Sequence, residues 1–510
     1  TSPFELKDMR LSVERIVDGI KRQEKIFIYG DYDADGTLAT SILYRGLKSL
    51  GAEVDYYIPN RFEEGYGLND EALKTLSEKG AELVITVDCG ISSVETVEYG
   101  NKLGLTMIIT DHHQCGERLP DACAVVNPHR GDCPSAFKEL CGSGVALKMV
   151  QGLGVELGRP GIEEDLIELA SIATVADIVP LIGENRVIVK EGLKRIGKSN
   201  NIGVQAMLKV CDLKGKAVNS YTFGFMIGPR INAAGRLDSA LSVVRLFTTE
   251  DREEADRIAQ ELDRENRERQ RIEKEILEKA IEKIETEGLA KGRMALVVDG
   301  EDWHEGVIGI VASRLVEQYY LPTMVISRSG DRAKGSARSI AGFHLFNAMS
   351  RIADLFQKFG GHEMAAGFSM ESSRIDELRE RMDGLAVEQS GGTPFLQEIR
   401  VDFRLEGRQV SRETYDLLRL LEPYGMGNPS PLFVCRGVRV LSFRKVGEDG
   451  KHLSLSLFDG EKVVAGIAFQ MGELADRLRD NMVVDLVCSL ELNSWNGFDK
   501  LQLGIKDIKL

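Results

Sequence analysis

The feature that most constrains the fold of this chain is the stretch at residues 25–36, which reads KIFIYGDYDADG. Its first half, residues 26–29, has the apolar pattern of a buried strand. The second half places Asp31, Asp33 and Asp35 at every second position. Because alternate side chains of an extended segment point the same way, we expect three carboxylates to converge at the carboxyl end of a strand. Open α/β sheets bind their ligands at that end.

Carboxylates crowded in this way repel one another, and burying them without a partner is costly. A divalent cation removes that cost, and a solvated acidic turn avoids it. A calcium-binding helix–loop–helix motif would need a glutamate at loop position 12. Counted from Asp31, that position is the apolar residue Ile42. The stretch therefore predicts either a metal site of another kind or an exposed acidic turn.

The bulk composition is that of a soluble globular protein. The chain has 510 residues, of which 43% are hydrophobic and 28% charged, enough for several domains. We find no apolar run of membrane-spanning length and no signal region, so we expect no membrane association. The first residue is Thr1 rather than Met, which leaves the natural N-terminus open. Eight scattered cysteines without a CxxC pair are typical of reduced thiols, and we expect a cytoplasmic location.

Two further bulk features bear on function. Cysteines between Cys115 and Cys141 lie near His112, His113 and His129, but their spacings are too wide for a standard zinc ribbon. The net charge of −15 argues against a protein that coats polyanions in general. It remains compatible with a nucleic-acid enzyme, because a local basic groove or bound metal ions can supply positive charge where phosphates bind.

Strands and helices alternate from residue 25 to about residue 128. Such alternation predicts an α/β fold with a mainly parallel sheet and helices on both faces. The expected strands are 25–29, 54–58, 83–87, 105–110 and 122–126, and the expected helices are 4–23, 38–49 and 70–79. Residues 143–212 are predicted to be mostly helical.

Residues 251–287 contain neither Pro nor Gly and predict one long helix. Apolar stripes occupy both ends, whereas residues 263–271 are polar throughout. A helix that is polar all round often bridges two domains through solvent, which we prefer here to a coiled-coil partner.

A second, smaller α/β domain is predicted after this helix, followed by a small β-barrel. The α/β part has expected strands at 294–298 and 323–327 and helices at 307–319, 344–358 and 373–388. After a linker at 389–394, regularly spaced short strands predict a barrel such as an oligonucleotide-binding (OB) fold; they are 432–434, 438–443, 453–458, 463–469, 483–490 and 501–505. The expected domains are 1–248 (catalytic), 249–290 (bridging helix), 291–390 (second α/β domain) and 395–510 (barrel).

More acids and histidines occur after later apolar runs. Asp88 follows the strand 83–87, and Asp111, His112 and His113 follow the strand 105–110. Asp177 interrupts the apolar segment ATVADIVP. Each alone has a simpler explanation, since a strand-end Asp often caps a helix or turn and paired histidines can be surface residues. Together with the first acidic stretch they predict a centre for Mn²⁺, Mg²⁺ or Zn²⁺, and the many carboxylates favour the first two.

The segments GDYDADG, VDCG, TDHH and ATVADIVP are similar, in order and spacing, to the four motifs of the DHH phosphoesterase superfamily. The later segment GGHEMAAG, residues 360–367, resembles the signature of the DHH-associated domain. GPRINAAGRL, residues 228–237, and the C-terminal barrel narrow the resemblance to the RecJ single-strand-specific exonucleases. The resemblance implies metal-dependent 5′→3′ degradation of single-stranded DNA to mononucleotides, in DNA repair and recombination.

The resemblance also implies the residues of a two-ion Mn²⁺ or Mg²⁺ centre. The implied metal ligands are Asp33, Asp35, Asp88, His112 and Asp177, with Asp88 bridging the ions and Asp31 a further possible ligand. His113 would face the scissile phosphate, where it either acts as a charged group or acid or merely orients the substrate. Asp88, His112 and His113 are thus the expected catalytic residues.

Substrate contacts are expected on other segments. Residues 332–339, RAKGSARS, are basic and rich in hydroxyls. The resemblance assigns Ser336 and Arg338 to the terminal phosphate, although a solvated strand end would explain the same pattern. The resemblance adds Arg61 and Arg236 as further contributors. It also implies that His362 holds a phosphate near the metals, for which a buried structural histidine is the alternative. In the barrel, candidates for contact with a single strand are Phe443, Arg444, Lys445, Lys451, His452 and Trp495.

Two other functions remain open at this stage. One is a phosphoesterase of the same superfamily that acts on short oligonucleotides, cyclic dinucleotides or pyrophosphate. The other is an inactive scaffold that binds single strands. The expected macromolecular partners are single-stranded DNA and a single-stranded-DNA-binding protein, and we expect a monomer.

Overall fold

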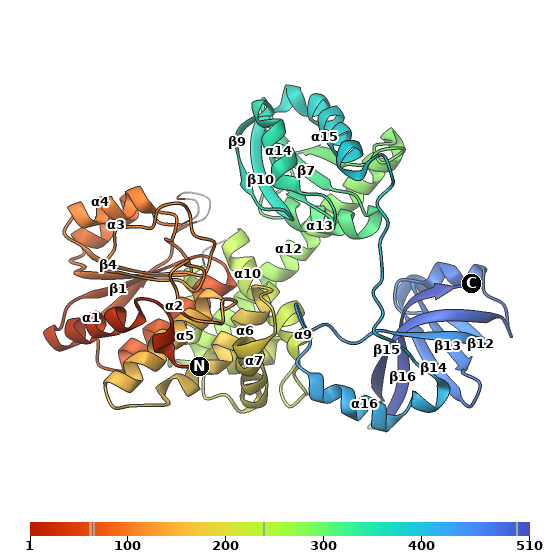
Figure 1. The fold of residues 1–510 in the computed structure, drawn as a ribbon, viewed down its shortest axis with the longest axis horizontal. Coiled ribbons are helices and arrows are strands. Elements are labelled where there is room, and N and C mark those ends of the chain that lie inside the picture. Colours follow the sequence, from red (N-terminus) through yellow and green to blue (C-terminus); the bar gives the residue numbers. More distant parts are fainter. Residues whose placement is uncertain (61–63, 65–66, 238–239, 496–497) are drawn as a thin grey trace. The chain divides into compact units, whose positions relative to one another are not determined.

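A five-stranded, fully parallel sheet carries the acidic motifs, as the alternating pattern predicts (Figure 1). Its strand order is β2 (Val54–Tyr57), β1 (Ile26–Gly30), β3 (Leu83–Val87), β4 (Thr106–Thr110) and β5 (Ala124–Val126). Both faces are covered by helices, since α3 (Asp70–Glu78) and α4 (Val94–Lys102) lie on one side and α1 (Met9–Arg22), α2 (Ala34–Ser49) and α5 (Gly142–Glu156) on the other. Every residue of β1 and β3 is buried, which explains their uninterrupted apolar sequences.

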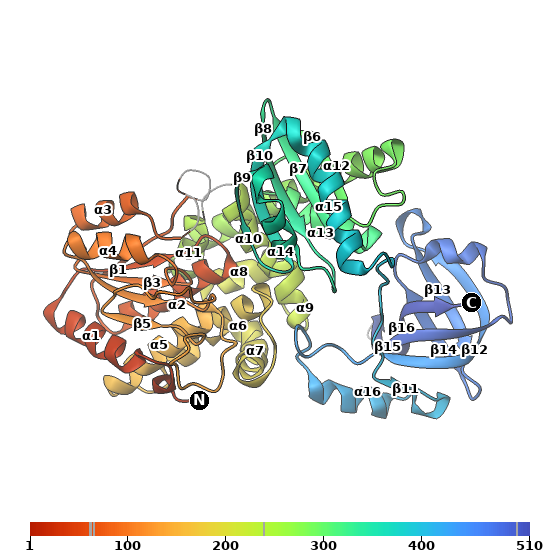
Figure 2. The ribbon, with the colours of Figure 1, turned by 45° about the horizontal axis from the view of Figure 1, so that its top comes forward.

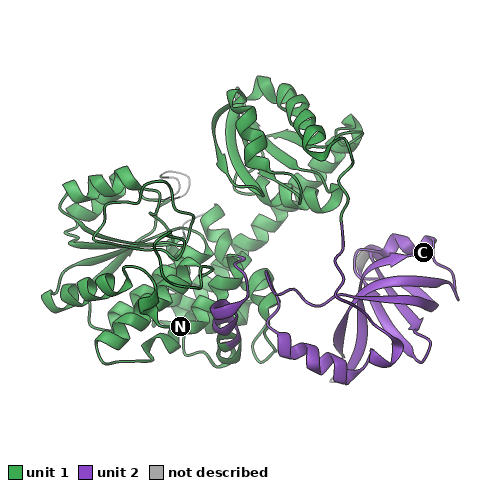
Figure 3. Ribbon diagram, in the orientation of Figure 1, with its two compact units in different colours: residues 1–177, 191–397 green, residues 178–190, 398–510 purple. Residues whose placement is uncertain are grey.

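This computed structural model describes the whole chain except residues 61–63, 65–66, 238–239 and 496–497. The chain divides into two compact units (Figure 3). The first comprises residues 1–177 and 191–397, and the second comprises residues 178–190 and 398–510. Among the described residues, no helix combines the length and the apolar character needed to cross a bilayer.

A group of helices follows the parallel sheet, as expected for residues 143–212. Its members are α6 (Ile167–Ala176), α7 (Gly183–Arg195), α8 (Ile202–Val210), α9 (Ser220–Thr222), α10 (Gly228–Leu237) and α11 (Leu241–Thr248). A π-helical turn, Phe223–Ile227, joins α9 to α10.

The predicted long helix is α12 (Arg252–Glu287), which at 1.5 Å per residue is about 54 Å long. One end packs against α8, α10 and α11, and the other packs against α13 (Ile308–Tyr319) and β6 (Leu296–Glu301) (Figure 2). The expectation that its polar middle is exposed all round is wrong. Asp263, Asn266 and Arg269 are buried there, because Asp263 pairs with Arg230 of α10 and Arg269 with Asn266 and Glu273.

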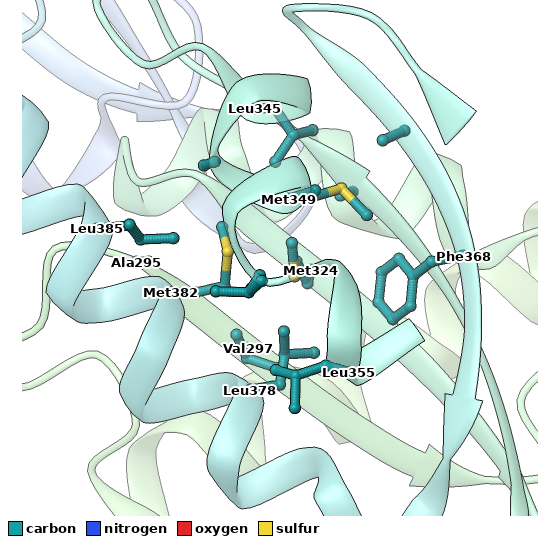
Figure 4. Close-up of a cluster of buried hydrophobic side chains, with 14 of the residues drawn as sticks. Ala295, Val297, Met324, Leu345, Met349, Leu355, Phe368, Leu378, Met382 and Leu385 are labelled. Carbon is teal, nitrogen blue, oxygen red and sulfur yellow. The ribbon is translucent and has the colours of Figure 1, made fainter. Parts of the chain in front are cut away.

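The second α/β domain is built on a mixed sheet. Its strand order is β6, β7 (Thr323–Ser329), β8 (Arg332–Arg338), β10 (Ala365–Glu371) and β9 (Phe356–Gly361). Only β6 and β7 are parallel. Helices α14 (Leu345–Arg351) and α15 (Ile375–Ser390) pack on this sheet through an apolar core that includes Met324, Phe368 and Leu378 (Figure 4). The expected helix 344–358 is too long, since Phe356 already begins the edge strand β9.

The C-terminal part of the second unit is a closed barrel with the predicted OB-like organisation. Its strands are β11 (Phe403–Arg404), β12 (Phe433–Val446), β13 (His452–Phe458), β14 (Val463–Ala468), β15 (Val483–Trp495) and β16 (Phe498–Lys509). Helix α16 (Arg412–Leu418) lies between β11 and β12 in the sequence. Pairing of β12 with β15 closes the barrel. The two strands expected at 432–434 and 438–443 are one strand with a register shift between Cys435 and Val438. The expected turn at Asn496–Gly497 lies outside the described residues.

Candidate active site

Strand register brings three acidic residues to one edge of the parallel sheet. Gly30 at the end of β1 pairs with Val87 at the end of β3, and Val87 pairs with Thr110 at the end of β4. The residues that follow these strand ends are Asp31, Asp88 and Asp111. All three are almost fully buried. The convergence of strand-end acids predicted from the sequence is therefore present.

The extended conformation predicted for residues 31–35 is wrong, because α2 begins at Ala34. Asp33 is the N-cap residue of this helix, and its carboxylate accepts a hydrogen bond from the backbone N–H of Gly36 at 3.0 Å. Asp35 lies in the first turn, where the positive end of the helix favours an anion. A side chain at Gly36 would place its Cβ 2.6 Å from the Cβ of Asp31, so this turn requires glycine.

The N-terminus of α5 fixes the carboxylate of Asp35. The backbone N–H groups of Gly142 and Ser143 donate to its two oxygens at 2.6 and 2.8 Å. A Cβ on Gly142 would lie 2.6 Å from Asp88. The absence of a side chain at this position therefore lets one helix end pack against two carboxylates.

His112 lies at the centre of the acidic cluster. Its Nε2 atom is 3.1 Å from an oxygen of Asp88 and 3.7 Å from oxygens of both Asp35 and Asp177. Asp177 comes from the C-terminal end of α6 and not from a strand end. The cluster thus combines a helix end with the edge of the parallel sheet.

The donor set fits divalent cations. In the described part of the chain, three groups have ligand atoms within 4.8 Å of one another: Asp88 with His112 and His113, Asp35 with His112 and Asp177, and Asp31 with Asp33 and Asp88. Single buried atoms of Asp31, Asp88 and His112 have no hydrogen bond of acceptable geometry to any described residue. Buried polar atoms are normally satisfied, and oxygen-rich sites with an imidazole suit Mn²⁺ or Mg²⁺. The shared residues Asp88 and His112 let these groups accommodate more than one ion.

The pKa values of the acidic cluster show that its carboxylates lack enough positive charge around them. Burial, followed by repulsion from Asp35 and Asp33, raises the pKa of Asp177 to about 9. Burial and neighbouring carboxylates also raise the pKa values of Asp31, Asp33 and Asp88. The pKa of His112 is lowered, chiefly by burial. The surroundings therefore disfavour the ionised form of these carboxyl groups, and a bound cation would stabilise that form.

Asp111 supports the second histidine instead of only capping a turn. One of its oxygens accepts hydrogen bonds from the backbone N–H groups of His112 at 2.7 Å and His113 at 3.0 Å, and lies 2.7 Å from Nδ1 of the His113 ring. Its other oxygen accepts from the backbone N–H of Ile91 at 2.9 Å. Burial opposes protonation of His113, but the hydrogen bond and charge of Asp111 outweigh it and raise the pKa of the imidazole. The arrangement orients His113 and favours its charged form.

Ser336 and Arg338 lie on neighbouring outward positions of β8, beside the start of α13. The Arg338 guanidinium donates to the Ser336 hydroxyl at 3.2 Å. A Cβ on Gly309 of α13 would lie 2.8 Å from the Ser336 oxygen and 3.1 Å from the guanidinium. No carboxylate pairs with Arg338 among the described residues, and burial alone lowers its pKa. A partly buried arginine next to a hydroxyl and a helix N-terminus is suited to bind a phosphate.

A cavity of about 410 Å³ adjoins this pair. Ser336 lines it, together with Gly306 and Ile308 at the start of α13, Lys334 of β8 and Lys358 of β9. Lys334 is paired with Glu305 at 2.6 Å. The cavity therefore combines Lys358, the Lys334–Glu305 pair and the Ser336 hydroxyl with an apolar wall that includes Phe359 and Phe368.

Helix α10 connects the acidic cluster with this second region. Near its middle, Asn232 accepts a hydrogen bond from the backbone N–H of Ala34 at 2.9 Å. At its end, Arg236 donates to the carbonyl oxygen of Gly306 at 2.8 Å. A Cβ on Gly235 would lie 2.5 Å from the carbonyl oxygen of Tyr32. Residues 228–237, singled out in the sequence only by family resemblance, thus contact the acidic loop on one side and the start of α13 on the other.

The other residues expected to contact the substrate belong neither to the acidic cluster nor to the Ser336–Arg338 pair. Arg61 lies outside the described residues. The side chain of His362 is exposed in the turn after β9, which excludes the buried structural role. In the barrel, Arg444 is exposed, Phe443 packs partly against the core, and Lys445 and Lys451 pair with Asp476 and Asp449. The ring of His452 lies edge-on to the exposed Phe469. The side chain of Trp495 is not among those described.

Sequence reasoning missed Asn232, Gly142, Ser143 and the orienting role of Asp111. Asp111 had a signal, since it stands at the strand end that supplies the two histidines. Backbone donors such as those of Gly142 and Ser143 carry no side-chain signature, and only the packing of α5 on α2 reveals them.

Comparison with known proteins identifies the class to which this fold and site belong. Residues 25–174 match the model of the DHH family N-terminal domain, residues 292–388 match the DHHA1 domain, and residues 401–507 match the RecJ OB domain. The chain is thus a DHH-type protein with the associated DHHA1 domain and a terminal OB domain.

The individual relatives narrow this class. Over 507 residues the chain is 39% identical to the single-stranded-DNA-specific exonuclease RecJ of Bacillus subtilis, covering 99% of this chain and 64% of that protein. It is 36% identical to the RecJ of Salmonella typhimurium, covering 98% of this chain and 89% of the relative. The crystal structure of Thermus thermophilus RecJ in complex with Mn²⁺ superposes with a TM-score of 0.86 at 32% identity, covering 99% of this chain and 72% of that one. The chain belongs to the RecJ family.

Proposed function

We propose that this chain is a divalent-metal-dependent exonuclease that degrades single-stranded DNA from the 5′ end to mononucleotides. The observation that carries the proposal is the convergence of Asp35, Asp88, His112 and Asp177 around one point of a RecJ-family chain. Relatives named single-stranded-DNA-specific exonucleases support the substrate, and the relative crystallised with Mn²⁺ supports the cofactor. Because the chain spans 64% of the B. subtilis relative's length, the activity of the longer protein is part of the proposal.

We assign Asp33, Asp35, Asp88, His112 and Asp177 as the ligands of two Mn²⁺ or Mg²⁺ ions. Asp31 belongs with them, because it shares a ligand group with Asp33 and Asp88 and has a buried oxygen without a hydrogen bond. When bound, such ions supply hydroxide at neutral pH and stabilise the attacking and leaving oxygens of a phosphodiester.

The protein groups provide positioning and fixed charge. The N–H groups of Gly142 and Ser143 hold Asp35 in one orientation, and the carboxylates of Asp35, Asp88 and Asp177 lie 3.1–3.7 Å from Nε2 of His112. Asp111 raises the pKa of His113, and the imidazole would stabilise negative charge on the scissile phosphate or donate a proton to the leaving oxygen.

The terminal phosphate of the substrate would bind at Ser336 and Arg338, with Arg61 and Arg236 as further contributors. His362 would hold a phosphate near the metal ions. Fixing the 5′ end at these residues, while the first phosphodiester lies at the acidic cluster, accounts for an exonuclease that starts from that end. Helix α10 supports this arrangement, since it contacts both the acidic loop and the start of α13.

The test uses the full chain and four substrates: 5′-³²P-labelled single-stranded DNA, blunt duplex DNA, a dinucleotide and pyrophosphate, each with Mn²⁺ or EDTA. We expect release of labelled mononucleotide from the single strand in Mn²⁺ only, and none with Asp88→Ala. The control Asp121→Ala changes an exposed loop carboxylate and should retain activity.

Three results would contradict the proposal: equal digestion of the blunt duplex, unchanged activity of Asp88→Ala, or preference for the dinucleotide or pyrophosphate. The last result would favour a small-substrate phosphoesterase. Binding of the strand without hydrolysis under all conditions would favour an inactive scaffold.

We further propose that the protein acts in the cytoplasm as a monomer, in DNA repair and recombination, with a single-stranded-DNA-binding protein as partner. All eight cysteines are free thiols, which is typical of a reducing compartment. Native mass spectrometry of the chain, alone and with such a binding protein, tests both the oligomeric state and the partner.

A further inference from the structure

The residue that follows Asp177 has an unusual backbone conformation. Ile178 has a φ angle of 61°, and a β-branched residue rarely adopts this left-handed region. Its side chain is 65% exposed, so burial of that side chain does not stabilise the conformation. Strained residues persist only where the surrounding structure fixes them. On one side the fixing element is α6, because the backbone N–H of Asp177 donates to Ala173 at 2.8 Å.

On the other side, the fixing element is residues 420–428, which we call the clamp loop. The backbone N–H of Leu181 donates to the carbonyl oxygen of Met426 at 2.7 Å. The guanidinium of Arg186 donates to the carbonyl oxygens of Leu420 and Glu422 at 3.0 and 3.2 Å. Residues 178–190 and the clamp loop belong to the same compact unit, so these contacts are internal to it.

The clamp loop is shaped for close approach to this segment. A Cβ on Gly425 would lie 2.6 Å from a methyl carbon of Leu181, and a Cβ on Gly427 would lie 3.0 Å from the Cβ of Pro180. The side-chain amide of Asn428 donates to the carbonyl oxygens of Leu421 and Pro423 at 2.9 and 2.8 Å. The loop is therefore braced internally and has no side chains where it meets Pro180 and Leu181.

We propose that the clamp loop, through its contacts with Leu181 and Arg186, is a positioning element for Asp177. The inference rests on the proposed function, in which Asp177 is a ligand. Its carboxylate oxygen lies 3.7 Å from Nε2 of His112, at the end of a helix. The main-chain angle of Ile178 sets the direction in which the chain leaves that helix, and the clamp loop fixes this angle from the far side. Loss of the clamp relaxes Ile178 and displaces the Asp177 carboxylate.

The test compares two glycine substitutions in the full chain. Gly427 and Gly437 have similar φ angles of 69° and 67°, but a Cβ on Gly437 would meet nothing within 4 Å. Alanine at either position therefore introduces the same backbone strain, and only Gly427→Ala disturbs the contact with Pro180. Isothermal titration with Mn²⁺ alone should show binding roughly tenfold weaker for Gly427→Ala, as is typical when a supporting group of a metal ligand is lost. Gly437→Ala should bind as the wild type.

The same variants are compared in kinetics on single-stranded DNA. For Gly427→Ala we expect a lower kcat at subsaturating Mn²⁺, recovery at high Mn²⁺, and an unchanged KM for DNA. A merely structural role would not give metal-dependent rescue. If Gly427→Ala does not fold, Arg186→Ala removes two clamp contacts without backbone strain and should weaken Mn²⁺ binding by about threefold.

Asp177→Ala separates failure of the clamp from failure of the site. If Asp177→Ala binds Mn²⁺ weakly while Gly427→Ala and Arg186→Ala bind it as Gly437→Ala does, the clamp is not a positioning element and the metal centre stands. If Asp177→Ala itself binds Mn²⁺ as tightly as the wild type, Asp177 is not a ligand, and that part of the proposed function fails with the clamp.

Discussion

The carboxylates of this site differ in the hydrogen bonds that they accept. Asp35 receives two backbone N–H groups, whereas Asp88 and Asp31 each retain a buried oxygen without a hydrogen bond. Asp111, by contrast, accepts from three backbone N–H groups, those of Ile91, His112 and His113, and lies 2.7 Å from the His113 ring. Asp111 is thus an orienting residue, although it stands at the same sheet edge as Asp31 and Asp88.

Asp111→Asn should lower kcat on single-stranded DNA by about 10- to 100-fold, the usual range for loss of a group that supports a metal or catalytic histidine. The amide preserves the shape but removes the charge that orients His113 and raises its pKa. The KM for DNA should not change. Asp132→Asn is the matched control, since Asp132 is an exposed carboxylate paired with Arg130 in the next loop. A normal kcat for Asp111→Asn, measured by release of mononucleotide, would remove Asp111 from the catalytic machinery.

Arg338→Ala should raise the KM for 5′-phosphorylated single strands by about 10- to 100-fold, because a charge-assisted hydrogen bond contributes about 1.5–3 kcal/mol. Binding of Mn²⁺ should be unchanged. Arg332→Ala is the control, since Arg332 lies on the same strand but its side chain is exposed. For single-stranded DNA that ends in a 5′-hydroxyl, the same substitution should change the KM little. Equal effects on phosphorylated and unphosphorylated strands would remove Arg338 from a phosphate pocket.

At the scale of helices and strands, periodicity in the sequence located most elements. The five parallel strands and the long helix were predictable because burial on both faces and unbroken helix-forming sequence leave strong local patterns. The edge strand β9, by contrast, reads FQKFGG and is largely exposed, so its sequence has no alternation by which to distinguish it from the end of the preceding helix.

The candidate site was predictable to the extent that its chemistry lies in side chains at strand ends. The register of Gly30, Val87 and Thr110 follows from a parallel sheet, and it brings Asp31 and Asp88 together. The conformation of residues 31–35 was not predictable from alternation alone, because Asp33 can continue a strand or cap a helix. Packing of α2 against α5 decides between the two. Contacts made by main-chain atoms, as in the clamp loop, have no sequence pattern.

Helix α12 is attached to the second sheet through a buried charge. Asp299 of β6 accepts from Lys283 of α12 at 2.9 Å, pairs with Arg328 of β7 at 2.5 Å, and also pairs with Arg379 of α15. Burial opposes ionisation of Asp299, but the hydrogen bond from Lys283 and the three cations outweigh it and lower its pKa. One carboxylate thus connects four elements.

Asp299→Asn should destabilise the second sheet by on the order of 3 kcal/mol, because three cations lose their counter-charge. The folded-state pKa is below the usual Asp value of about 3.9, so the wild type keeps this contribution above about pH 4 and loses it as the pH falls through the folded pKa. Hydrogen exchange of β6 and α15 amides measures both effects. Asp376→Asn is the control, since Asp376 also pairs with Arg379 but is exposed. Equal protection in both variants would contradict the prediction.

For the molecule as a whole, the acidic cluster sets function against stability. The chain carries a net charge of −15, and the cluster brings together carboxylates whose pKa values are raised by burial and mutual repulsion. Without a cation this arrangement opposes folding. With a cation the binding free energy contributes to stability, by about 2.7 kcal/mol when the ion is present at 100 times its Kd.

Asp177→Asn should therefore have opposite effects on stability with and without metal. In EDTA at pH 7 the variant should unfold at a higher temperature than the wild type. Folding raises the pKa of Asp177 to about 9, so the wild-type carboxyl must take up a proton when the chain folds, and the neutral amide avoids this cost. In saturating Mn²⁺ it should unfold at a lower temperature, because a ligand is missing and less binding free energy is gained. Differential scanning calorimetry of the full chain measures both, and Asp18→Asn, at an exposed position of α1, should show the Mn²⁺ response of the wild type. If Asp177→Asn shifts the transition in the same direction under both conditions, then Asp177 is a structural residue and the cluster does not trade stability for metal binding.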